Sequence, residues 1–359
     1  MYTRPHLFDL DADTLHQLVT DWDMPPYRSD QVLEWVYRHR VADPQRMTNL
    51  SVNHRAKITR HLQITTGRVT RHQTAADGVQ KLLIEFDKVN DQKRPVVHSN
   101  ASQIECVVIP TDRRKTACVS SQAGCPVGCR FCASGIGGLD ANLTAGQIVE
   151  QVWMLANLPN VGRITNVVFM GMGEPLANFS QVTRAVHTLM ADWGMSISGR
   201  RITISTVGLP AQVRRLADLQ LPVTLAISLH APNDSLRRRL IPWADYVTVE
   251  QLIDAGRYYF DRTGREVTLE YILLGGVNDQ PEQARELATV AQRLRSNVNL
   301  IRYNEVDGLP YARPHPQHVH DFQQVLRSAG INVHLRASRG RDIAAACGQL
   351  RHEHPVTTQ

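Results

Sequence analysis

Residues 122–134 read Gln122-Ala-Gly-Cys125-Pro-Val-Gly-Cys129-Arg-Phe-Cys132-Ala-Ser134, and the rest of the chain is organised around this stretch. Its three thiols stand at C-x3-C-x2-C spacing in a short loop rich in Gly and Pro, which is typical of a loop that wraps one small object. Thiolates are soft ligands that suit zinc or an iron–sulfur cluster. Structural zinc normally takes four ligands, and no fourth Cys or His follows the loop at a matching spacing. The loop therefore favours a cluster, with a zinc site or structural thiols as the alternative.

A [4Fe–4S] cluster can bind three thiolates and leave its fourth iron open for a reactant. The spacing, with the aromatic Phe131 directly before the last Cys, resembles that of the radical S-adenosylmethionine (SAM) enzymes. In those enzymes the open iron chelates the amino and carboxylate groups of SAM. The resemblance implies a [4Fe–4S] cluster and SAM as cofactors, with Cys125, Cys129 and Cys132 as the cluster ligands.

Length and composition indicate a globular protein with a sizeable core. The chain has 359 residues, enough for one large catalytic domain and a smaller one, and 42% of them are hydrophobic. It has no apolar run of membrane-spanning length, and its first residues lack the apolar segment of a signal peptide. Six cysteines, three of them in one loop, favour a reducing compartment over a disulfide framework. We therefore expect a cytoplasmic protein that makes no use of a membrane.

The basic residues are unusual in kind. The net charge is +6, and of the 40 basic residues five are Lys and the other 35 are Arg. Arg suits phosphate groups and stacked bases better than Lys does, which favours RNA as a partner. The codon usage of a GC-rich genome would give the same bias, so charge alone does not decide.

The first 112 residues divide into a helical and a β-rich part. Residues 1–65 carry two apolar helical stripes and a third helical pattern at 47–62, and we expect a small accessory domain there. Residues 66–112 contain two runs of β-formers, 81–86 and 103–109. The second run includes Glu105, and a lone carboxylate in a strand is usually a surface residue.

Residues 113–345 alternate short apolar runs with helical patterns. Six such units predict an α/β fold with a parallel sheet, either doubly wound or curled into a partial barrel. A further run at 331–335 would extend the edge of the sheet. The expected strands are 117–121, 165–170, 202–206, 223–229, 267–274 and 298–303, and clear helical patterns cover 145–158 and 281–294.

Polar residues follow these strands where each one ends. Glu174 follows the second strand, Ser205 closes the third, Ser228-Leu229-His230 closes the fourth, and Asn304 follows the sixth. In parallel α/β folds the carboxyl ends of the strands meet at one edge, where the loops build the active site. We therefore expect a single site that extends from Cys125 to Asn304.

At this point the chain resembles the radical SAM adenine methyltransferases of large-subunit ribosomal RNA, nearly from end to end. The resemblance implies a partial parallel (β/α)6 radical SAM barrel, a helical RNA-binding domain at 1–65, and a tail at 346–359 that carries a methyl-accepting Cys. The matching stretches are Tyr27-Arg28-x-x-Gln31-x-x-x-Trp35, Cys118-Val-Ser-Ser-Gln-Ala-Gly-Cys125, the cysteine loop, Asn142-Leu143, Met170-Gly-Met-Gly-Glu-Pro175, Arg200-Arg-Ile-Thr-Ile-Ser-Thr206, Ser228-Leu-His-Ala-Pro-Asn-Asp234, Gly276-Val-Asn-Asp279, Asn299-Leu-Ile301 and Ala346-Cys347-Gly-Gln-Leu350.

The resemblance also implies roles for individual residues. Glu105, Cys118 and Cys347 would be catalytic. The contacts to SAM would come from a second group, made of Gly173, Glu174, Ser205, Ser228, Leu229, His230 and Asn304.

The family's chemistry gives the two lone cysteines a task. Adenine carbons 2 and 8 are not nucleophilic, and the resemblance implies that one SAM would methylate Cys347 and that a radical derived from a second SAM would remove hydrogen from that S-methyl group. The carbon radical would add to adenine, Glu105 would take the ring proton, and Cys118 would attack the bridging sulfur. The resulting Cys118–Cys347 disulfide would then be reduced.

The sequence leaves the modified carbon open. Leu139 and the Ile301-Arg-Tyr-Asn304 ending look closer to the carbon 8 branch, which confers antibiotic resistance, whereas carbon 2 methylation is the more widespread activity and is favoured here. We expect a monomer that acts on 23S rRNA, with tRNA as a second candidate, and an electron donor such as flavodoxin. The alternatives are a metal-binding RNA-binding protein without catalysis, and a radical SAM enzyme acting on a protein or small molecule, which would leave Cys347 without a task.

Overall fold

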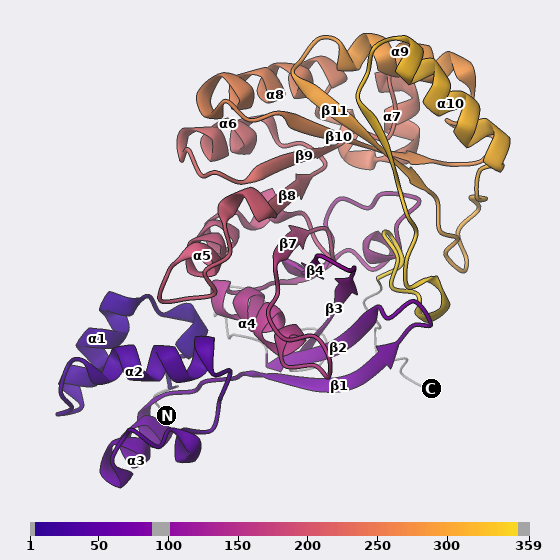
Figure 1. Cartoon of the computed structure of the whole chain (residues 1–359). Helices are drawn as coiled ribbons and strands as arrows, with labels where there is room; N and C mark the ends of the chain where they lie inside the picture. Colours follow the sequence, from indigo (N-terminus) through magenta and orange to yellow (C-terminus); the bar gives the residue numbers. More distant parts are fainter. Residues whose placement is uncertain (1–3, 88–100, 351–359) are drawn as a thin grey trace.

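A computed structural model describes residues 4–87 and 101–350 (Figure 1). One sheet of ten strands runs through the molecule. In spatial order its strands are β1 (Gly67–Thr74), β2 (Gln80–Asp87), β3 (Ala101–Pro110), β4 (Lys115–Cys118), β7 (Asn166–Phe169), β8 (Ile202–Thr206), β9 (Thr224–Ser228), β10 (Val267–Leu273), β11 (Ser296–Arg302) and β12 (Val333–Arg336).

The sheet is parallel from β4 to β12 and antiparallel from β1 to β4. This confirms the predicted alternation of strands and helices and the α/β class, with β12 as the additional edge strand. The long helices along the parallel part are α4 (Ala145–Ala156), α5 (Phe179–Met190), α6 (Pro210–Asp218), α8 (Val249–Thr263), α9 (Pro281–Ala291) and α10 (Pro316–Ser328), and the shorter α7 (Asp234–Leu240) follows β9. β10 is buried along its whole length, as expected for a strand covered on both faces.

Three local predictions differ from the structure. The third helix of the N-terminal part, α3 (Val52–His61), begins later than expected, because Ser51 caps it and a separate 3-10 turn (Pro44–Arg46) precedes it. β4 ends at Cys118 rather than at 121. A hairpin of β5 (Gln122–Gly124) and β6 (Leu139–Asn142) encloses the cysteine loop and was not predicted.

The strands of the β-rich part, β1 to β3, belong to the same sheet as the parallel strands, because β3 pairs with β4.

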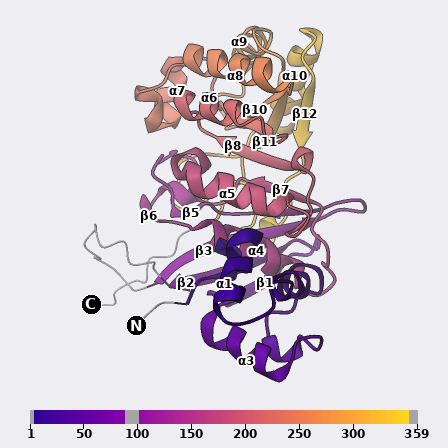
Figure 2. The ribbon, with the colours of Figure 1, turned by 90° about the vertical axis from the view of Figure 1, so that its left-hand side faces the viewer.

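The N-terminal helices α1 (Ala12–Asp21), α2 (Arg28–Leu33) and α3 pack at the end of the molecule that carries α4 and β1 (Figure 2). Their core is continuous with that of the barrel. Phe8 contacts Trp153 of α4 with ring centroids 5.9 Å apart, and the Trp153 indole donates a hydrogen bond of 2.8 Å to the Val36 carbonyl. Removal of residues 1–65 would therefore uncover apolar surface of the barrel, so single substitutions are the better test of what this part does.

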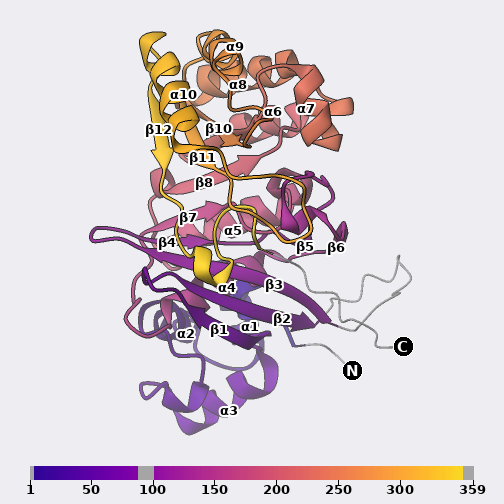
Figure 3. The same cartoon turned by 90° about the vertical axis from the view of Figure 1, so that its right-hand side faces the viewer.

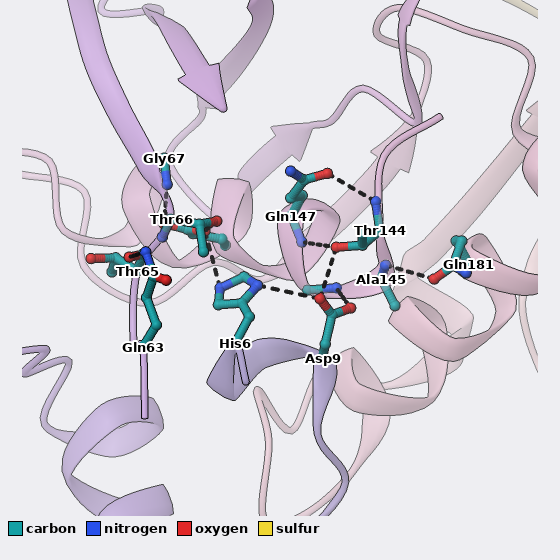
Figure 4. Close-up of polar contacts among 12 residues, drawn as sticks. His6, Asp9, Gln63, Thr65, Thr66, Gly67, Thr144, Ala145, Gln147 and Gln181 are labelled. Carbon is teal, nitrogen blue, oxygen red and sulfur yellow. Dashed lines mark hydrogen bonds and ion pairs between the residues drawn. The ribbon is translucent and has the colours of Figure 1, made fainter. Parts of the chain in front are cut away.

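A buried polar joint fixes the N-terminal segment to the start of α4 (Figure 4). His6 lies between Asp9 and Glu150, with ion-pair distances of 3.4 and 3.2 Å. Asp9 accepts the Gly146 amide (2.6 Å) and the Thr144 hydroxyl (2.9 Å), at the N-terminus of α4 where an anion is favoured. Glu150, fully buried, also accepts the Thr66 amide. Burial alone would lower the pKa of His6, but its contacts with Asp9 and Glu150 raise it to about 9.

This joint predicts a loss of stability in alkaline solution. Because the folded pKa of His6 lies above the unfolded value, its stabilisation is complete below about pH 6.5 and is lost as the pH rises through about 9, by on the order of 3 kcal/mol. Urea unfolding at pH 6 and pH 10 should show this loss in the wild type and in the control His334→Gln, which alters an exposed side chain. His6→Gln should be less stable at pH 6 and should lose less on going to pH 10. An equal pH dependence in all three proteins would contradict the assignment.

The C-terminal segment, residues 337–350, crosses the open side of the curved sheet (Figure 3). At its beginning the Gly340 amide donates to Asp77, in the turn between β1 and β2, over 3.0 Å. At its end the Ser134 hydroxyl donates to the Leu350 carbonyl over 2.6 Å, and the Ala133 amide donates to Gly348. The segment is thus tied both to the β1–β2 turn and to the cysteine loop, and it carries Cys347 between them. Over the described ranges, the chain has no helix long and apolar enough to cross a membrane.

Candidate active site

Two adjoining cavities lie on the concave side of the sheet. The smaller, of about 150 Å³, is next to the cysteine loop at the carboxyl ends of the parallel strands. The larger, of about 410 Å³, lies inside the curve of the sheet and is lined by residues from every parallel strand. Cys347 lines both cavities, as do Glu270 and Arg336.

The cysteine loop is held in shape by backbone contacts. The Cys125 amide donates to Gly138 of the β5–β6 hairpin (2.8 Å), and the Arg130 amide donates to Leu240 at the end of α7 (2.9 Å). Gly124 has φ +72°, and a side chain there would collide with the Gly138 carbonyl, so this entry to the loop requires Gly. These contacts place the three thiols at one side of the smaller cavity.

The three thiols of the loop need cations nearby to ionise. Burial raises the pKa of Cys125 to about 12 and that of Cys129 well above its usual value, so stable thiolates there need metal cations. A structural zinc ion takes four protein ligands, whereas a [4Fe–4S] cluster can take three thiolates, each on a different iron. Cys125, Cys129 and Cys132 are therefore suited to hold a cluster.

Glu174 is the acidic group of the smaller cavity. It is buried, and its carboxylate accepts the amides of Leu176 (2.9 Å) and Val207 (2.8 Å). Burial raises its pKa to about 7 despite these contacts. A cationic group such as an amine would restore its charge by pairing with it. Gly173, directly before it, has φ +99° and lies against Gln122, where a larger residue would not fit.

The other polar strand ends meet in the same cavity. The hydroxyls of Ser205 and Ser228 lie 3.2 Å apart. His230 accepts the Ile272 amide at Nδ1 (3.1 Å), and burial, with Arg237 nearby, lowers its pKa to about 3, so its ring is neutral. Asn304 lines the larger cavity instead. Glu174, Ser205, Ser228 and His230 thus line one cavity together with the cysteine loop, whereas their roles toward a ligand stay a prediction.

Cys118 and Cys347 meet although they lie at opposite ends of the barrel sequence. Both line the larger cavity. Burial, and then the proximity of Cys347, raises the pKa of Cys118 to about 12. All six cysteines are free thiols, so the disulfide expected between Cys118 and Cys347 is not present in this structure.

Two of the predicted site residues line neither cavity. Glu105 lies on the same face of β3 as Val107, the partner of Cys118, but it forms an ion pair with buried Lys81 over 2.7 Å. Leu229 is fully buried. Its carbonyl accepts a hydrogen bond from Arg237.

Sequence reasoning missed three charged residues in or next to the site, which are Glu270, Arg336 and Arg237. Glu270 accepts hydrogen bonds from Asn299 (3.0 Å) and Arg336 (3.4 Å) at the junction of the two cavities. Arg237 is fully buried and donates to the carbonyls of Val207 and Leu229, at the ends of two barrel strands. Burial lowers its pKa to about 10. Glu270 lies inside a strand, and Arg237 begins a run of three Arg that looks like a solvated helix face, so only the buried surroundings identify them.

Comparison with known proteins agrees with the fold and identifies the family. Residues 5–64 match the ribosomal RNA large subunit methyltransferase N-terminal domain, and residues 119–288 match the radical SAM superfamily. The chain is 40% identical over 347 residues to the probable dual-specificity RNA methyltransferase RlmN of Rhodopirellula baltica, covering 96% of this chain and 90% of the relative. It is 39% identical over 350 residues to the Bacillus subtilis protein of the same name, covering 97% and 93%.

A solved structure is similar throughout. The crystal structure of a radical SAM methyltransferase from Sphaerobacter thermophilus superposes with a TM-score of 0.90 at 41% identity, and the match covers 97% of this chain and 99% of that one. With a cysteine loop suited to a cluster, polar strand ends around one cavity, and this similarity along both chains, the protein belongs to the RlmN family of radical SAM RNA methyltransferases.

Proposed function

We propose that this enzyme methylates a ring carbon of adenine in 23S rRNA, with carbon 2 favoured, through an S-methylcysteine formed on Cys347. The observation that carries the proposal is the position of Cys347, which lines both the cavity beside the cysteine loop and the larger cavity. A group carried on its sulfur would reach both. The relatives are named dual-specificity RNA methyltransferases, which supports a second RNA substrate, and we propose tRNA in that role.

When bound, the [4Fe–4S] cluster and SAM would supply a radical that can remove hydrogen from a methyl group. Glu174, Ser205, Ser228 and His230 would hold the polar parts of SAM against the cysteine loop. The protein orients the reactants and excludes water, and the cofactor carries the difficult step.

The two cysteines of the larger cavity have separate tasks. Cys347 gives up its thiol proton and takes a methyl group from the sulfonium of one SAM, which leaves as S-adenosylhomocysteine. After a hydrogen atom is removed from the S-methyl group, its carbon bonds to the adenine ring. The ring loses one proton and one electron, and the electron would pass to the bound cluster. Cys118 then gives up its thiol proton and attacks the Cys347 sulfur. The sulfur–carbon bond breaks, the carbon takes up a proton to become the product methyl group, and the two sulfurs form a disulfide that a dithiol can reduce. Glu105 receives the ring proton in this scheme, which requires it to leave its partner Lys81.

The proposal is tested by expressing the protein in cells that lack endogenous adenine methylation. Mass spectrometry of digested rRNA and tRNA should detect 2-methyladenosine. 8-Methyladenosine in its place would support the second candidate, in keeping with Leu139 and with Ile301, which lines both cavities. Anaerobic reconstitution should give a brown protein that forms 5′-deoxyadenosine. Bound zinc without SAM cleavage, or unmodified RNA in both fractions, would overturn the proposal.

A further inference from the structure

The larger cavity has two distinct ends. Its inner end is formed by Cys118, Cys347 and Asn304, at the carboxyl side of the strands. Its outer end is lined by polar residues that stand first or second in their strands, which are Thr116 of β4, Asn166 of β7, Thr203 of β8, Thr224 of β9 and Thr268 of β10. The cavity therefore extends along the inner face of the curved sheet toward the amino ends of the strands, away from the cysteine loop.

Four arginines gather at this outer end. Arg114 directly precedes β4, and Arg200 and Arg201 form the turn that directly precedes β8. Arg339, in the C-terminal segment, donates a hydrogen bond of 3.0 Å to the Pro110 carbonyl, at the end of β3. The side chains of Arg114, Arg200 and Arg201 are exposed. Where the structure describes the chain, none of the four forms an ion pair with an acidic side chain.

The charged residues that line the larger cavity are basic with one exception. Glu270 is the single acidic residue among the described residues that line it, and it lies deep, already paired with Arg336 and Asn299. Four guanidinium groups that have no acidic partner in the described part of the chain, placed around a mouth with polar walls, form a site for a polyanion. A cavity of about 410 Å³ has room for one nucleotide and none for a double helix, so the polyanion that fits is RNA presented as a loop or a single strand.

The cysteine-loop end is less suited to RNA. The cavity there is small and is lined in part by the apolar residues Val127 and Phe131. The C-terminal segment covers this side through the hydrogen bonds of Ala133 and Ser134. Arg238 and Arg239 of α7 are exposed, and they lie near this end because the neighbouring Leu240 contacts the cysteine loop. The presence of basic residues alone therefore does not show from which end of the barrel RNA would approach.

We propose that RNA enters the barrel from the amino ends of its strands, opposite the cysteine loop, and that Arg114, Arg200, Arg201 and Arg339 bind the phosphates on either side of the target nucleotide. This inference rests on the proposed function and adds the direction of approach. Nucleotide and SAM would then meet at Cys347 from opposite sides of the barrel, and RNA could leave without disturbing the groups around the cysteine loop.

The test compares two pairs of exposed arginines in the full-length protein. A fluorescent, unmodified 23S rRNA transcript serves as the probe, and anisotropy gives its Kd across a series of salt concentrations. The double variant Arg200→Gln with Arg201→Gln should weaken binding at least tenfold at 150 mM salt. It should also lower the slope of log K against log salt by about 1.4, which is the value for two lost contacts to phosphates of a single strand. The matched pair Arg238→Gln with Arg239→Gln should stay within about twofold of the wild type.

Both pairs should keep the wild-type melting temperature, and RNA-free 5′-deoxyadenosine formation should not change. A loss of affinity in the Arg238/Arg239 pair alone, or equal affinities in all three proteins, would overturn the proposed approach while leaving the methylation chemistry intact. If instead the wild type leaves the transcript both unbound and unmodified, the proposed function itself fails.

Discussion

Cys118→Ala is expected to leave the protein covalently joined to its RNA. In the proposed reaction the methylene carbon bridges the Cys347 sulfur and adenine until a second thiol attacks that sulfur. Cys118 shares the larger cavity with Cys347, and the remaining free thiol outside the cysteine loop, Cys106, is fully buried on the opposite face of β3. Loss of Cys118 should therefore permit radical addition and block release.

The adduct should be detected as a slowly migrating band that ribonuclease removes. Its mass should map to the peptide that contains Cys347, and methylated product should fall below detection. Cys347→Ala and the double variant should give no adduct. Cys106→Ala is the matched control, because it removes a neighbouring thiol of the same sheet and should turn over normally. Normal turnover by Cys118→Ala, or an adduct elsewhere, would show that the methylcysteine scheme is wrong for this chain.

Cys125→Ala, Cys129→Ala and Cys132→Ala should each abolish 5′-deoxyadenosine formation. All three thiols line the cavity that also holds Glu174, and each would bind a different iron. Three thiolates are the minimum for a cluster with one open iron, so the loss of any one should remove the path of electrons to SAM.

The measurement is anaerobic reconstitution with iron and sulfide, followed by chromatography of the nucleosides formed from SAM. Cys106→Ala should retain both the brown colour and the activity, since its thiol lies outside the site. If any one of the three loop variants cleaves SAM at the wild-type rate, the ligands are misassigned.

The sequence by itself determined the features that depend on neighbours along the chain. The spacing of the three thiols predicts a cluster-binding loop, because the ligands of such a loop are neighbours along the chain. The alternation of short apolar runs and helical patterns predicted the parallel sheet, since a crossover between parallel strands needs a helix and has one hand. That sheet in turn grouped Glu174, Ser205, Ser228 and His230, because the carboxyl ends of parallel strands share one edge.

The family resemblance, rather than any pattern, supplied the roles of Cys118 and Cys347. In isolation Cys118 looks like a core thiol of a strand, and Cys347 looks like a small apolar residue of a helical run. Residues 344–347 of this run are in fact irregular chain, which follows a short 3-10 turn (Arg341–Ile343).

The tertiary structure alone decided which distant side chains meet. The meeting of Cys118 and Cys347 depends on how residues 337–350 cross the sheet, and Asp77, Ala133 and Ser134 fix that path through hydrogen bonds between segments far apart in sequence. The ion pair of Glu105 with Lys81 follows from strand register, and the joint of His6 with Glu150 follows from domain packing. Strand register and domain packing depend on the total free energy of burying whole faces of strands and helices against one another. A local sequence pattern does not contain that total.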